Sequence, residues 1–128
     1  MISFLNPDKI VSQLFYYHSQ FHFYHLQTKS YAQHKNLNDL YEFLEDSKDD
    51  ISEYLLGVIA PKRFSSLENK PFLPYSEENV AKSLDELFKF TIEICDYAKG
   101  KNWEQLCNLA SELQGAVSKS KYFNTFNK

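Results

Sequence analysis

The chain has 128 residues, which is enough for one domain with a substantial core and too few for two domains of ordinary size. Its net charge is −3 and Arg63 is its only arginine, so it lacks the basic stripe of a nucleic-acid-binding protein. No apolar run approaches the roughly 20 residues that span a bilayer, and the opening stretch MISFLNPDK lacks the pattern of a signal peptide. We therefore expect a single domain over residues 1–128 in the cytoplasm, with no DNA or membrane partner.

Three glycines and four prolines leave the chain few natural breaks, which favours long helices. The spacing predicts a first helix from Pro7 to about Gln27, with Asn6 as its N-cap and proline at its first position. Its apolar positions recur at helical intervals and are Ile10, Leu14, Tyr17, Phe21 and Tyr24.

A second helix is predicted after a short break, with Thr28 or Ser30 as its N-cap, and it ends at Gly57, which is a natural helix-ending residue. Ser30 with Gln33 three residues later fits a capping box, in which each side chain satisfies the backbone amide of the other residue. The apolar side of this helix consists of Leu37, Leu40, Leu44, Ile51, Leu55 and Ile59.

Residues 60–75 hold three of the four prolines and form the one long connection. Two further helices are predicted, from Ser76 to Gly100 and from a cap at Asn102 onward. Their apolar positions are Val80, Leu84, Leu87, Phe88, Phe90, Thr91, Ile94, Cys95, Leu106, Leu109, Ala110, Leu113 and Val117. Four amphipathic helices with short, long and short connections predict an all-α, ferritin-like four-helix bundle with a long crossover between helices 2 and 3.

The two cysteines, Cys95 and Cys107, are too few for a disulfide framework or a thiolate metal site. They lie on helices that are expected to be adjacent. We expect both to be buried free thiols in a reducing compartment.

All four histidines fall within seventeen consecutive residues: His18, His22, His25 and His34. The first three share one side of the first helix, so one possibility is an imidazole trio that binds Zn²⁺ or Ni²⁺. The alternatives for His18 and His25 are residues that support metal ligands, or ordinary polar interface residues.

The second helix has a polar face that carries further candidate ligands. At about 100° per residue, His34, Asp49 and Glu53 lie within about 100° of one another and opposite the apolar side. Such a face can simply be solvated. The carboxylates of Asp49 and Glu53, at i and i+4, are also spaced so that their oxygens can converge on one cation.

His22 and His34 lie at similar heights on either side of the short break, so they could share a site. Asp49 lies fifteen residues beyond His34, or about 22 Å along the helix, so one chain cannot bring both pairs to one metal. Two copies can do so if their second helices pack antiparallel about a twofold axis, which creates two identical sites. Mixed imidazole and carboxylate ligands suit Fe(II) better than Ca²⁺ or structural Zn²⁺.

The series His22, His34, Asp49 and Glu53 has the spacing of the ferroxidase signature of the Dps proteins, or miniferritins. The segments HKNLNDLY and DDISEYLLG also resemble that family, and the resemblance covers residues 14–57. It implies an intersubunit site, with both histidines from one chain and both carboxylates from the other. Iron would be oxidised there, preferentially by hydrogen peroxide rather than oxygen, and stored as ferric mineral inside a dodecameric shell.

By the same resemblance, Glu53 anchors or bridges iron, Asp49 and His22 complete the first site, and His34 serves a second. The chain departs from the family at Asn38, where an aspartate is usual, and an amide is a weaker iron ligand than a carboxylate. It also lacks the lysine-rich tail that gives many members DNA binding. The alternative is a ferritin-like bundle with a degenerate metal site that acts as a structural or interaction protein, for example in a virus. We assign no redox role to the tyrosines or to Trp103.

Overall fold

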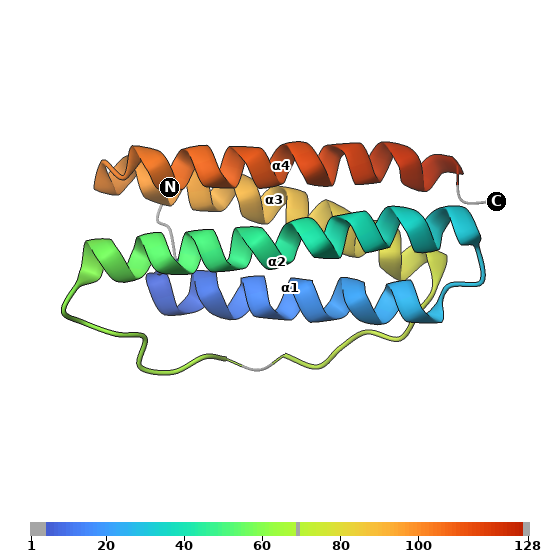
Figure 1. The fold of residues 1–128 in the computed structure, drawn as a ribbon, viewed down its shortest axis with the longest axis horizontal. Helices are drawn as coiled ribbons and strands as arrows, with labels where there is room; N and C mark the ends of the chain where they lie inside the picture. The colour runs from blue at the N-terminus through green and yellow to red at the C-terminus, as the bar shows by residue number, and fades with distance from the viewer. Residues whose placement is uncertain (1–4, 69, 127–128) are drawn as a thin grey trace.

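The computed structural model describes residues 5–68 and 70–126 (Figure 1). These residues form four α-helices and a short 3₁₀ helix: α1 Pro7–Gln27, α2 Tyr31–Ile59, α3 Glu77–Lys101, α4 Glu104–Phe123 and η1 Asn124–Phe126. No strand occurs in the described part of the chain, so the all-α prediction is confirmed. None of the helices in that part has an apolar stretch long enough to cross a membrane.

The helices are arranged as two antiparallel hairpins, α1 with α2 and α3 with α4 (Figure 1). The connection over residues 60–76 runs back along the length of α1, so α2 and α3 point in the same direction (Figure 1). The two hairpins meet where α2 packs against α4 and α1 packs against α3.

The connection is held to α1 by the buried side chain of Gln20, which is fully shielded from solvent. Its Nε2 donates to the carbonyl of Leu73 at 3.1 Å, and its Oε1 accepts from the amide of Leu73 at 2.7 Å. A buried amide side chain must find such partners, because leaving it unpaired costs about 1–3 kcal/mol. Gln20 therefore fixes the second half of the connection against the middle of α1.

The predicted side-chain N-caps are present at the starts of three helices. Asn6 accepts from the amide of Lys9, Ser30 from that of Gln33, and Ser76 from that of Asn79, at 2.9, 3.1 and 2.9 Å. The reciprocal half of the capping box at Ser30 does not form. The Gln33 side chain instead accepts from the hydroxyl of Thr28 at 2.6 Å and donates to Asn124 at 3.0 Å, which ties the α1–α2 turn to η1.

Two predicted helix boundaries are wrong. α2 continues through Gly57 to Ile59, because Gly57 does not adopt the positive φ of a helix-ending glycine. Asn102 does not cap α4 with its side chain. It is the C-cap of α3, at φ 60° and ψ 35°, a left-handed conformation that asparagine tolerates. α4 begins after Trp103 without a side-chain cap.

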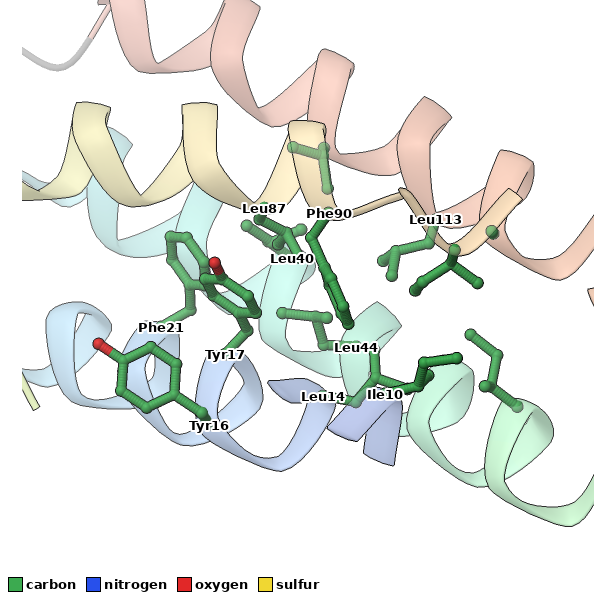
Figure 2. Packing of buried hydrophobic residues seen from close by; sticks show 14 of the residues in the cluster. Ile10, Leu14, Tyr16, Tyr17, Phe21, Leu40, Leu44, Leu87, Phe90 and Leu113 are labelled. Atoms are coloured by element: carbon green, nitrogen blue, oxygen red, sulfur yellow. The ribbon is translucent and has the colours of Figure 1, made fainter. Parts of the chain in front are cut away.

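Apart from Ile59 and Thr91, the predicted apolar positions of all four helices meet in one core (Figure 2). Figure 2 shows Leu14 and Phe21 of α1, Leu44 of α2 and Leu87 of α3 within this cluster, and all four are at most 1% exposed. The members at the edges of the predicted stripes, such as Leu109, are only half-buried. Helical periodicity therefore identified most of the core, but it missed the buried residues Val11, Tyr16 and Ala98.

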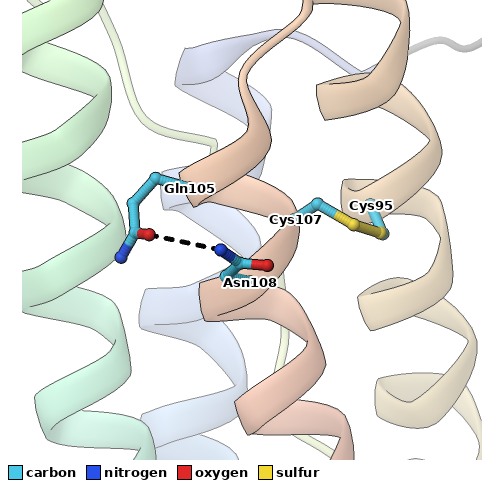
Figure 3. The surroundings of a disulfide bond; sticks show 4 residues. All are labelled: Cys95, Gln105, Cys107 and Asn108. Carbon is cyan, nitrogen blue, oxygen red and sulfur yellow. Dashed lines mark hydrogen bonds between the residues drawn. A yellow bond between two sulfur atoms is a disulfide. The ribbon is translucent and has the colours of Figure 1, made fainter.

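Cys95 of α3 and Cys107 of α4 form a disulfide, so the expectation of free thiols is wrong (Figure 3). The two residues lie at similar distances from the α3–α4 turn, and the antiparallel hairpin brings their Cα atoms to 4.2 Å. Neither side chain is fully buried. The bridge cross-links the second hairpin near the turn.

Candidate metal-binding site

The four histidines gather with one tyrosine where α1 faces α2. We call this group the histidine–tyrosine cluster; its members are His18, His22, His25, His34 and Tyr41. Its centre is Tyr41 of α2, whose ring centroid lies 4.4 Å from that of His22, 5.1 Å from His25 and 5.8 Å from His18. The rings of His25 and His34 stack at 4.1 Å.

Tyr41 was not among the predicted site residues. The signal for it is its position seven residues after His34, on the same side of α2, opposite histidines spaced i, i+4 and i+7 on α1. An aromatic residue at helical spacing is more often part of a core. Tyr41 is half-buried, with its ring between the two helices.

The tautomer of His34 is set by its neighbour on α1. Its Nδ1 lies 2.9 Å from the carbonyl oxygen of His25, which can only accept, so Nδ1 carries the proton and donates. The lone pair of the neutral ring is then on Nε2. Metal-ligating histidines are commonly held in this way, with one ring nitrogen bonded to a carbonyl and the other free for the metal.

His25 is the buried member of the cluster, at 7% exposure. Burial lowers its pKa, and the neighbouring His34 lowers the pKa further. Its Nδ1 has no hydrogen bond of acceptable geometry, although the backbone of His22 is close enough to oppose the shift. His18 behaves similarly: burial, then the charge of Lys48, lower its pKa. Both rings are therefore mainly neutral at pH 7.

The predicted carboxylate ligands lie elsewhere on α2. The side chains of Asp49 and Glu53 are exposed, and neither makes a hydrogen bond or ion pair with the described residues. Asp49 is near enough to His18 to raise its pKa slightly against the larger effects of burial. Along the helix, Asp49 is about 22 Å from His34.

One chain thus brings His22 and His34 to the same cluster, where both rings contact His25. It does not bring Asp49 and Glu53 to them. Across residues 5–68 and 70–126, no three His, Cys, Asp or Glu side chains are grouped so that they could hold a metal ion. The predicted four-ligand site and the imidazole trio on α1 are both absent from the single described chain.

Asn38 lies one helical turn after His34, at the position where a further iron ligand was considered. Its Nδ2 donates to Oε1 of Glu42 at 3.2 Å, within α2. The amide oxygen is the only side-chain atom through which Asn38 could bind a cation, and it carries no charge. This position therefore adds little to a second metal site.

One family profile, described as "Family of unknown function (DUF5856)", matches residues 25–123. The matched range contains His34, Asp49 and Glu53 and begins after His22. No curated protein and no solved structure matches the chain.

Proposed function

The chain belongs to DUF5856, a family of unknown function, and we propose that it is a Dps-like miniferritin that binds, oxidises and stores iron. Iron is the substrate and cargo, and hydrogen peroxide is the preferred oxidant. The site is formed at a twofold interface by His22 and His34 of one copy with Asp49 and Glu53 of another. Parallel α2 and α3, joined by one long connection, support a ferritin-like bundle.

The observation that carries the proposal is the separation of two incomplete ligand pairs, one shared by α1 and α2 and the other on α2 alone. His22 and His34 are at the turn end of the α1–α2 hairpin, and Asp49 and Glu53 are unpaired farther along α2. An antiparallel α2–α2 contact between two copies would place the histidine pair of each copy beside the carboxylate pair of the other copy, which gives two sites per dimer. The tautomer of His34 supports a ligand role, because it leaves Nε2 unprotonated.

The surface around His22 is suited to contact with a second copy of the chain. Phe15, His22 and Leu26 project from one side of α1, within about 40° of one another. Phe15 is 43% exposed and Leu26 is 62% exposed. Large apolar side chains beside a half-formed ligand set are suited to burial against a second copy, which would also remove water from the site.

The proposed reaction requires Fe(II) held by these four ligands, with hydrogen peroxide as the oxidant. Carboxylate and imidazole ligands hold Fe(II) and favour its loss of an electron, because the two carboxylates stabilise the higher charge of Fe(III). Two Fe(II) ions supply two electrons to one hydrogen peroxide. The O–O bond breaks, two protons are taken up, and two water molecules form. Hydrolysis of the ferric product then gives the stored mineral.

A second candidate function rests on Asn38. Because its amide bonds to Glu42 within α2, the chain lacks a carboxylate that would complete another iron site. A helical bundle with such a degenerate site could act as a structural or interaction protein. That candidate predicts no peroxide-dependent iron oxidation, so the test below separates the two.

The test compares Asp49→Asn with Asp50→Asn in stopped-flow oxidation of Fe(II) by hydrogen peroxide. Both carboxylates are exposed on α2, but Asp50 is about 100° farther round the helix, so it is a matched control. We expect Asp49→Asn to slow oxidation at least about tenfold, because the amide removes a charged ligand. Asp50→Asn should keep the wild-type rate.

Equal rates for the two variants would contradict the proposed site. Oxidation by the wild-type protein no faster than in buffer would contradict the function itself. Light scattering on the same samples adds an independent check, since a monomer cannot assemble an intersubunit site.

A further inference from the structure

A cavity of about 420 Å³ lies at the other end of α1 from the histidine–tyrosine cluster. It is open to solvent on one side and is bordered by the start of α1, the end of α2 with the beginning of the connection, and the α3–α4 turn. Its volume is within the range of small-molecule binding sites, roughly 300–1,000 Å³. The proposed iron chemistry does not use it.

The cavity collects positive charge in a chain whose net charge is −3. Lys62, Lys101 and Arg63, the only arginine, line it together with a single carboxylate, that of Asp8. Within residues 5–68 and 70–126, none of the three cations makes an ion pair. Three unpaired cations around one cavity repel one another, and an anion would relieve that repulsion.

The carboxylate of Asp8 offsets only one of the three positive charges, and the charge of Lys62 lowers its pKa less than its hydrogen bonds with Ser65 and Ser66 do. Its Oδ2 accepts hydrogen bonds from the hydroxyl and the amide of Ser65, at 2.7 and 3.2 Å, and from the amide of Ser66 at 3.4 Å. The carboxylate is thus engaged in holding the connection to the first turn of α1. Three cations against one carboxylate leave a net charge of about +2 among the residues that line the cavity.

The remaining wall of the cavity is aromatic. The rings of Tyr97 and Trp103 meet edge to face with centroids 5.9 Å apart, and Nζ of Lys101 lies 5.8 Å from the ring centroid of Tyr97. Trp103 is half-buried, so part of its ring is available to a ligand. A flat aromatic surface beside a group of cations matches a ligand with a planar ring and a phosphate group.

We propose that this cavity binds a nucleotide, with the phosphate among Lys62, Arg63 and Lys101 and the base against Trp103. Arg63 offers the planar, two-pronged donor geometry that suits a phosphate. The positive end of the α1 dipole, at the cavity's edge, acts in the same direction.

Trp103 is the only tryptophan of the chain, so its fluorescence reports directly on this cavity. We expect AMP to change that fluorescence saturably in the full-length protein, with adenosine and inorganic phosphate each binding at least about tenfold more weakly because each lacks half of the ligand. Isothermal calorimetry with AMP provides the affinity independently of the fluorescence.

The matched pair of variants is Arg63→Gln and Lys89→Gln, both at exposed positions, with Lys89 in the middle of α3. Arg63→Gln should weaken AMP binding about tenfold, and Lys89→Gln should leave it unchanged. No heat and no saturable fluorescence change with millimolar AMP would overturn the proposal, as would equal affinities for the two variants. Equal affinities for AMP and adenosine would overturn the phosphate assignment. None of these outcomes depends on iron oxidation.

Discussion

His25 is the histidine that the fold removes from solvent, and its ring links His22 to His34. It was predicted as a member of an imidazole trio, as a residue that supports metal ligands, or as a polar interface residue, and the structure places its ring against those of the predicted ligands His22 and His34. Through its carbonyl it also fixes the tautomer of His34. The spacing of the histidines was visible in the sequence. The stacking of their rings was not, because it depends on how closely two helices approach.

The lowered pKa of His25 makes the free energy of unfolding depend on pH. The unfolded chain takes up the proton near the ordinary pKa of 6.5, before the folded chain does. The free energy of unfolding should therefore be unaffected above that pH, fall as the pH drops below it, and level off below the folded-state pKa. The charges of His34 and His22 add to this effect, and the backbone of His22 and the charge of Glu42 oppose it.

We expect urea denaturation of the wild-type protein to show this loss of stability between about pH 7 and pH 5. His25→Gln should reduce the slope, leaving the contribution of His18, whose pKa is lowered in the same direction. Lys89→Gln is the control, because Lys89 is exposed on α3 and lies outside the histidine–tyrosine cluster. Parallel pH profiles for the wild type and His25→Gln would show that His25 is not the group responsible.

The helices themselves were predictable because each one has a single apolar side. Ile10, Leu40 and Leu113, from three different helices, are all at most 3% exposed, as the periodicity requires. The helix ends were less predictable where one residue could serve either of two helices. From the sequence, Asn102 could cap the start of α4 or the end of α3. The tight turn between the two helices makes it the C-cap of α3.

The disulfide between α3 and α4 was missed because sequence alone does not set the rotation of one helix against another. We expect Cys95 and Cys107 to resist alkylation under denaturing conditions until a reductant is added. For cysteines twelve residues apart, the bridge should stabilise the protein by up to about 3 kcal/mol, so the double variant Cys95→Ser/Cys107→Ser should melt at a lower temperature. Alkylation of both cysteines without reductant would contradict the bridge.

At the scale of the whole molecule, the two ends of α1 differ in chemistry. One end has neutral imidazoles and exposed apolar side chains, and the other has a cationic cavity with an aromatic wall. The imidazole end was predictable from spacing within one hairpin. The cavity was not, because Asp8, Arg63 and Lys101 are far apart in sequence and are brought together only by the course of the connection and the α3–α4 turn.

The proposed iron site requires two copies, because one chain does not bring Asp49 and Glu53 to His22 and His34. Its most direct test is complementation between two inactive variants. One carries His22→Ala and the other carries Asp49→Asn with Glu53→Gln. In each variant alone, every site lacks at least one of its four ligands.

When the two variants are refolded together, one of the two sites in each mixed dimer regains all four ligands. Random pairing makes half of the dimers mixed, so we expect about a quarter of the wild-type rate of Fe(II) oxidation by hydrogen peroxide. The activity should appear only after the subunits have exchanged. A mixture as inactive as the separate variants, although light scattering shows that they assemble together, would contradict an iron site shared between two copies of this chain.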